Sequence, residues 1–127
     1  MNGRDAIILF AHGAKHARWA LPLQQLQRTL ALARPQSLVQ IAFLELQEPS
    51  LAESLATVAA AGCRRIDVVP IFWSQGGHIA QDLPQMVREF AAREPGVVIR
   101  VLPVLSELPG MEQFLAQAIL AQTQRSP

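Results

Sequence analysis

The run Ala6-Ile7-Ile8-Leu9-Phe10-Ala11 decides how this sequence folds, because it is apolar throughout and is followed at once by His12 and Gly13. A strand with one face in water alternates apolar and polar residues, whereas a strand buried on both faces does not. The run therefore predicts a strand of a parallel sheet that is covered on both sides.

Three further runs of the same kind follow along the chain. They are Val39–Leu44, Arg65–Phe72 and Val97–Leu102. Successive runs begin about 30 residues apart, which is the length of a unit of strand, helix and strand. Apolar residues recur at helical spacing between the runs and after the last one. These helical stripes are Trp19–Ala33, Leu51–Ala59, Leu83–Ala91 and Met111–Ile119.

Capping and breaking residues agree with this pattern. Ser50 and Glu53 form a capping box that starts the second helix, and Gly62 stands where that helix would end. Asp82 can cap the third helix, with Pro84 in its first turn. We therefore expect an α/β fold, a three-layer sandwich in which strand and helix alternate four times around a four-stranded parallel sheet.

Length and composition restrict the class of protein. The 127 residues fit one domain, 1–127, and half of them are hydrophobic. The formal charge of +1 argues against a nucleic-acid binder. The single cysteine, Cys63, excludes an internal disulfide. The first apolar run is too short for a signal peptide or a membrane span, so we expect a cytoplasmic protein with no membrane partner.

The loops after the strands are where a site is expected, because ligands of parallel sheets bind beyond the carboxyl ends of the strands. All three histidines of the chain, His12, His16 and His78, fall in two of these loops. Neutral imidazole is a common ligand of first-row divalent metals, so His12 and His78 together indicate a metal site. Glu48, after the second strand, could orient a ligand or accept a proton.

Each of these residues also has a structural interpretation. His12 and His78 could bond to backbone in tight turns, and His16 could be a solvated surface residue. Glu48 could simply favour the positive end of the second helix. The pair Gly76-Gly77 would let the backbone approach a flat ligand and could offer N–H groups to an anion.

Taken in order, these segments resemble the short CbiX-type sirohydrochlorin chelatases, single-domain members of the class II tetrapyrrole chelatases. The resemblance runs from about Ile7 to about Leu120 and rests on the ordered combination of segments. These are Ala11-His12-Gly13, Ala42-Phe43-Leu44-Glu45, Glu48-Pro49-Ser50-Leu51, Val68-Val69-Pro70-Ile71-Phe72, Gly76-Gly77-His78 and Asp82-Leu83-Pro84.

The resemblance implies an enzyme that inserts cobalt, or in some members nickel or iron, into sirohydrochlorin, for cobalamin or sirohaem biosynthesis. The metal is a substrate, no organic cofactor is expected, and short members pair as homodimers. By the same resemblance, His12 is a metal ligand and the proton acceptor, and His78 is the second metal ligand. Glu48 contacts substrate and joins the two histidines as a catalytic residue. The expected substrate-binding residues are Glu48, Trp73, Ser74, Gln75, Gly76, Gly77 and Lys15.

The segment after the first strand departs from the family pattern. The family usually reads His-Gly-Ser-Arg-Asp there, whereas this chain has His12-Gly13-Ala14-Lys15-His16. Ala14 lacks the hydroxyl, Lys15 keeps the charge without the fork of an arginine, and His16 could add a ligand. These changes bear on substrate and metal preference more than on reaction class.

Basic residues near this edge would attract the carboxylates of sirohydrochlorin. The candidates are Lys15, Arg18 and Arg88, which could equally be ordinary solvated charges.

Two other functions fit parts of the pattern. A strand followed by His-Gly also opens the phosphohistidine mutases and phosphatases, but an arginine precedes the histidine there and Ala11 does here. A non-catalytic metal carrier or partner protein of the tetrapyrrole pathway would use the same histidines to bind metal. Such a carrier would not accelerate insertion of the metal into sirohydrochlorin.

Overall fold

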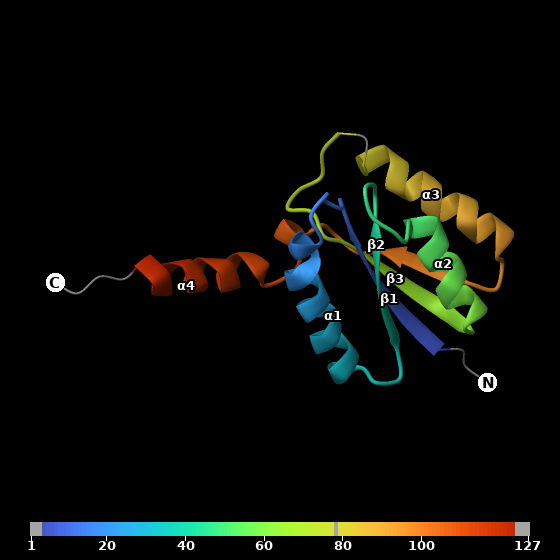
Figure 1. Ribbon diagram of the computed structural model, residues 1–127, viewed down its shortest axis with the longest axis horizontal. Helices are drawn as coiled ribbons and strands as arrows, with labels where there is room; N and C mark the ends of the chain where they lie inside the picture. Colours follow the sequence, from blue (N-terminus) through green and yellow to red (C-terminus); the bar gives the residue numbers. More distant parts are fainter. Residues whose placement is uncertain (1–3, 78, 124–127) are drawn as a thin grey trace.

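The four apolar runs form one parallel sheet in the computed structural model of the chain, which describes residues 4–77 and 79–123 (Figure 1). The strands are β1 (Arg4–Ala11), β2 (Leu38–Phe43), β3 (Cys63–Pro70) and β4 (Val98–Val101). Their order is β2-β1-β3-β4, and all neighbours are parallel. β1 therefore lies inside the sheet, which explains its unbroken apolar run. The predicted fold class is confirmed.

Helices connect the strands and follow the last one. They are η1 (Ala17–Ala20), α1 (Leu21–Ala33), α2 (Leu51–Ala60), α3 (Ile79–Arg93), the short η2 (Leu105–Glu107) and α4 (Met111–Thr123). Figure 1 shows α1 on one side of the sheet and α2 with α3 on the other. The sheet is thus the middle layer of three.

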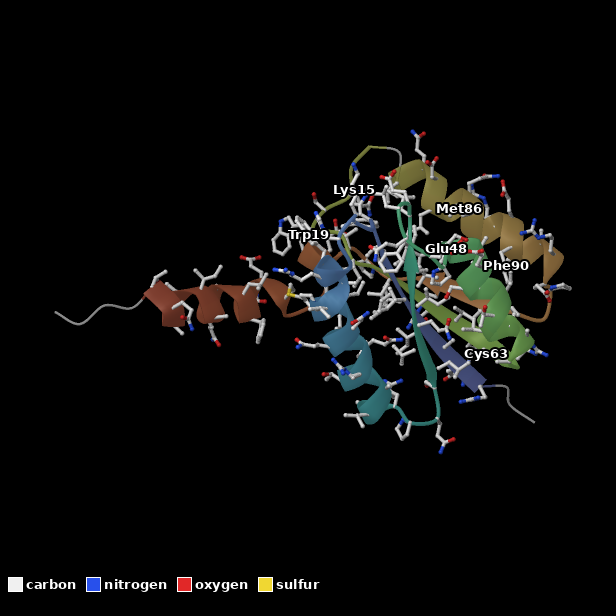
Figure 2. The ribbon with its side chains drawn as sticks, viewed as in Figure 1. Lys15, Trp19, Glu48, Cys63, Met86 and Phe90 are labelled. Atoms are coloured by element: carbon white, nitrogen blue, oxygen red, sulfur yellow. The ribbon has the colours of Figure 1, made fainter. Side chains whose placement is uncertain are left out.

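The main core lies between the sheet and the layer formed by α2 and α3. Alternate residues of β1, namely Ala6, Ile8 and Phe10, are buried in it, as the two-residue period of a strand requires. Leu55 and Val58 of α2 pack into the same cluster and are equally inaccessible. Phe90 and Met86 of α3 close it from the far side (Figure 2).

The boundaries of α2 confirm the predicted capping. The hydroxyl of Ser50 accepts a hydrogen bond from the backbone N–H of Glu53 at 3.1 Å. The carboxylate of Glu53 accepts one from the N–H of Ser50 at 2.8 Å. Gly62, just past the helix end, has a φ of +95°, a left-handed conformation in which glycine is preferred.

The predicted start of the third helix is wrong. α3 begins at Ile79, so Asp82 is part of its first turn rather than its cap, and Pro84 lies inside the helix. Ile79 and Leu83, one helical turn apart, both pack against the core. This packing extends the helix toward the N-terminus and outweighs the hydrogen bond that Pro84 cannot donate.

The buried stripes predicted for the first and last helices are also largely wrong. All residues of α1 are described, and none is buried; Trp19, just before it, is 72% exposed. α4 is likewise fully described without a buried residue, and Phe114 is 66% exposed. The reason is visible in Figure 1, where α4 extends away from the sheet. Like every helix in the described ranges, it lacks the length and apolarity needed to cross a membrane.

We predict that Leu55→Ala destabilises the fold by about 3 kcal/mol, within the range for truncation of a buried leucine. Leu55 is 1% exposed, so the truncation leaves a cavity between sheet and helix. Urea unfolding followed by circular dichroism measures the change. The matched control is Leu32→Ala, because Leu32 is 83% exposed. The control should change stability by less than about 0.5 kcal/mol. Equal losses in both variants would contradict the placement of the core.

Cys63 provides a second test of the core. The side chain is fully buried, its sulfur lies 3.8 Å from the carbonyl oxygen of Asp5, and burial raises the pKa of the thiol. A raised pKa leaves less of the reactive thiolate at neutral pH. We therefore predict that a chromogenic disulfide reagent labels Cys63 in urea-denatured protein at once and in native protein only as fast as it unfolds. Rapid labelling of the native protein would refute this.

Candidate functional site

The site predicted from the sequence lies at one edge of the sheet. Because all four strands are parallel, their last residues meet at the same edge. Those residues are Ala11, Phe43, Pro70 and Val101. The loops that follow them carry the candidate residues.

His12 follows β1 directly, and its side chain is exposed at this edge. The imidazole packs edge-on against Phe72, with ring centroids 4.9 Å apart and an interplanar angle of 84°. Phe72 packs edge-on in turn against the buried Phe10, with centroids 5.8 Å apart. A line of aromatic contacts thus connects the hydrophobic core to His12 and restricts the position of its ring.

Hydrogen bonds hold the loop of His12 to the loop that follows β2. The N–H of Glu45 donates to the carbonyl oxygen of His12 at 3.1 Å. The N–H of Ala14 donates to Oε1 of Gln47 at 2.8 Å. The two loops therefore continue the pairing of β1 with β2 past the ends of the strands, and the backbone of His12 is held from both sides.

Gly13 makes this close approach of the loops feasible. Its φ is +94°, in the left-handed region, and a Cβ at this position would collide with the carbonyl oxygen of Glu45. The facing loop also contains a strained residue, since Leu46 has a φ of +68°. Backbone strain of this kind persists only where the surroundings enforce it, as the hydrogen bonds around His12 do here.

Two hollows flank His12. The larger has a volume of about 430 Å³, and its wall includes His12, Phe72, Trp73, Ser74 and Gly76. The smaller has a volume of about 180 Å³, and its wall includes His12, Trp19, Phe43 and Gln47. The two tryptophans stand largely exposed, Trp73 at 59% and Trp19 at 72%. The edge thus offers one imidazole between two apolar walls.

The structure brings His12 together with Trp73, Ser74 and Gly76, as predicted. Gln75 instead lines a separate hollow between β4 and α3. Gly77 has a φ of +56°. Around Gly76 and Gly77, an added Cβ would meet no described atom within 4 Å. Close packing within the described chain therefore does not explain these glycines.

The remaining predicted residues are spread along the same edge. Lys15 and His16 are exposed on the loop before η1, and the carbonyl oxygen of His16 accepts a hydrogen bond from Trp19 N–H at 3.1 Å. Glu48 is exposed on the loop before α2. In Figure 2, Lys15 and Trp19 lie toward α1, whereas Glu48 lies toward α2.

The expectation for one basic residue is wrong, and one histidine cannot be placed. Arg88 is the tenth residue of α3, so it lies about 14 Å along the helix from Ile79 and away from the edge. Its guanidinium donates to the side-chain carbonyl of Gln85 at 2.9 Å. Arg18, by contrast, is exposed on η1 beside the site. His78 lies outside the described residues.

Within residues 4–77 and 79–123, no three side chains of His, Cys, Asp or Glu gather as a metal site. The pairing of His12 with His78 stays a prediction.

Sequence reasoning missed three residues that shape the site. Phe72 was assigned to the end of a strand, yet it forms the wall behind His12. Trp19 was assigned to a buried helical stripe, yet it borders the smaller hollow. Gln47 gave no sequence signal beyond its position next to Glu48 and after β2.

Comparison with known proteins places this geometry in context. The profile of the CbiX family matches residues 6–122. A sirohydrochlorin cobaltochelatase of Saccharolobus islandicus is 32% identical over 81 residues, which are 64% of this chain and 62% of that protein. The corresponding protein of Methanococcoides burtonii is 26% identical over 88 residues, which are 69% of this chain and 67% of that protein. The match to the first relative thus spans less than two thirds of its length.

Solved structures share the fold. A CbiX protein from Marinobacter aquaeolei VT8 superimposes with a TM-score of 0.79 at 30% identity, over 96% of this chain and 99% of that one. The sirohydrochlorin chelatase SirB from Bacillus subtilis subspecies spizizenii, solved in complex with cobalt, superimposes with a TM-score of 0.69 at 25% identity. That match covers 79% of this chain and 43% of the other.

We predict that Gly13→Ala destabilises the protein by about 2 kcal/mol or more, because it adds both a left-handed residue and a backbone collision. Thermal unfolding measures the loss. The matched control is Gly96→Ala, since an added Cβ there meets no described atom within 4 Å and no positive φ has to be kept. If both variants melt together with the unsubstituted protein, the description of the Gly13 loop is incorrect.

Proposed function

We propose that this chain, which belongs to the CbiX family, is a chelatase that inserts a divalent metal, cobalt in the first place, into sirohydrochlorin. The observation that carries the proposal is the position of His12. It is exposed, held from behind by Phe72, and shared by the walls of two hollows. The cobaltochelatase relatives and the cobalt complex of SirB support the choice of reaction and metal.

The chemistry exchanges one divalent ion for two pyrrole protons. The pyrrole N–H bonds break as metal–nitrogen bonds form, so a base is needed at the face of the ring from which the metal arrives. A neutral imidazole can bind first-row divalent metals and can also accept protons near neutral pH. In the proposal, His12 and His78 hold the incoming metal, and His12 takes up a released proton before passing it to solvent.

The walls of the larger hollow suit a flat macrocycle. Trp73 and Phe72 offer aromatic surface beside His12, and Ser74 and Gly76 add polar groups and open backbone. In the proposal the macrocycle lies along this wall with one face toward His12. Gln75 and Gly77, on the same loop, remain proposed contacts at its periphery.

Charged residues at the rim complete the proposed site. Lys15 and Arg18 are exposed on the segment after β1 and would attract the carboxylates of sirohydrochlorin. Glu48 is exposed on the loop before α2, whose shape is supported by a hydrogen bond from Phe43 N–H to the carbonyl oxygen of Pro49 at 2.8 Å. We propose that Glu48 contacts substrate and relays protons outward from His12.

The same proposal extends to organisation and setting. Residues 1–127 would act as one domain, the working unit would be a homodimer, and the reaction would take place in the cytoplasm. Insertion of cobalt would serve cobalamin biosynthesis, whereas insertion of iron would serve sirohaem biosynthesis.

We predict that His12→Ala lowers the rate of cobalt insertion by at least about 100-fold, the lower end of the effect of a general base. The measurement is an anaerobic assay with sirohydrochlorin and Co²⁺, followed by absorbance. His16→Ala is the matched control, because His16 is an exposed histidine four residues away on the same loop. It should keep nearly the full rate.

Three outcomes of this assay are informative. Near-normal turnover by His12→Ala would overturn the proposed role of His12. Tight binding of Co²⁺ by the unsubstituted chain without turnover would favour the metal carrier, which the altered segment Ala14-Lys15-His16 would then explain. Faster insertion of Ni²⁺ or Fe²⁺ than of Co²⁺ would overturn the choice of metal while leaving the reaction class in place.

A further inference from the structure

α4 exposes an apolar surface that is unusual for a helix of a folded domain. The exposed fractions are 66% for Phe114, 59% for Ile119 and 64% for Leu120. The 13 residues of α4 are fully described, and none is buried. An isolated helix of this length is only marginally stable in water, so α4 needs a surface to pack on.

The sheet has an uncovered surface of complementary size. On β3, Ile66 and Val68 point into the core beneath α2 and α3, so Arg65 and Asp67 point to the opposite face. The neighbouring β4 presents Val98 on that face, 66% exposed. We call the part formed by Asp5, Arg65, Asp67, Val98 and Arg100 the open sheet face. It contains a shallow hollow of about 370 Å³.

A parallel sheet is ordinarily covered on both faces. Here α1 packs beside β2, which leaves the other half of that face, over β3 and β4, without a helix of its own chain among the described residues (Figure 1). The sandwich therefore lacks the second helix of one layer, while α4 lacks a sheet.

The charges on the open sheet face allow an apolar helix to cover it. Asp5 pairs with Arg65 at 3.0 Å, and Asp67 pairs with Arg100 at 3.1 Å, in both cases across neighbouring strands. These charges already have partners, so covering them would leave no lone charge buried. α4 itself carries one charged residue, Glu112, at its first turn, where a negative charge is favourable.

The connection into α4 directs the helix away from its own sheet. Leu105 N–H donates to the carbonyl oxygen of Phe72 at 2.9 Å, which ties η2 to the site loop. Leu108 N–H donates to Leu105 O at 3.2 Å, and Met111 N–H donates to Leu108 O at 3.0 Å. Only Leu108–Gly110 separate η2 from α4, and these bonds leave no slack for the helix to fold back.

We propose that α4 of each chain packs on the open sheet face of a second copy, so that two chains exchange their last helices in a symmetric dimer. The inference rests on the homodimer of the proposed function and assigns its interface. An exchange of this kind is self-complementary, as a two-fold axis requires. Because η2 is bonded to the loop of Phe72 and Trp73, each exchanged helix leaves from the site edge, beside the hollow that holds His12.

Cross-linking between two separately substituted chains tests the interface. One chain carries Phe114→Cys and the other Val98→Cys, and the mixture is treated with a short flexible bismaleimide. The proposal predicts a linked dimer from the mixture, and none from the unsubstituted chain, whose Cys63 is buried. Placing both substitutions on one chain gives a dimer again. An internally linked monomer from that chain would put α4 on its own sheet and overturn the proposal, as would a mixture that does not link.

A charge placed on the helix provides an independent test. Light scattering on the unsubstituted chain is expected to give the mass of a dimer, and Phe114→Asp the mass of a folded monomer. Gln113→Asp, an exposed polar position of the same helix, is the control and should remain dimeric. A dimer that survives Phe114→Asp, or an unsubstituted chain that is a monomer, would overturn the proposal. A dimer that passes these tests yet inserts no metal would refute the chelatase and leave the exchange in place.

Discussion

The parallel pairing of β1 between β2 and β3 is the constraint on which the rest of the structure depends. A strand that is paired on both sides and covered on both faces has no contact with water along its length, so its residues must be apolar. Parallel strands also need a long connection for each step across the sheet, which the helices supply. The same pairing makes all strands end at one edge. His12 is therefore the first residue after β1 that can be polar and exposed.

The site depends on how firmly that first residue is held. An exposed histidine after a strand would ordinarily sample several positions. Here its ring leans on Phe72, and its backbone is bonded to the loop that follows β2. Restricting a side chain before substrate arrives removes an entropy loss that binding would otherwise incur. Gly13 and Leu46, both at positive φ, are the local strain that this tight arrangement requires.

Much of this could be read from the sequence, and the exceptions have physical causes. The strand run from Ala6, the capping box at Ser50 and the convergence of loops at one edge depend on local chemistry and periodicity, and the structure confirms them. The start of α3 depends on tertiary packing of Ile79, which local rules do not contain. The stripe on α4 does predict a helix that packs, but periodicity cannot say which surface covers it. The position of His78 stays a prediction.

The line from Phe10 through Phe72 to His12 has a consequence for how variants of this protein are interpreted. Phe10 is fully buried and would be classified as a residue that matters for stability alone. Because it supports the ring that supports His12, a smaller side chain there would also let the imidazole shift. Stability and reactivity are thus encoded in one shared residue at this point of the fold. Selection for either property constrains the other, and the usual separation of scaffold from chemistry does not apply to Phe10.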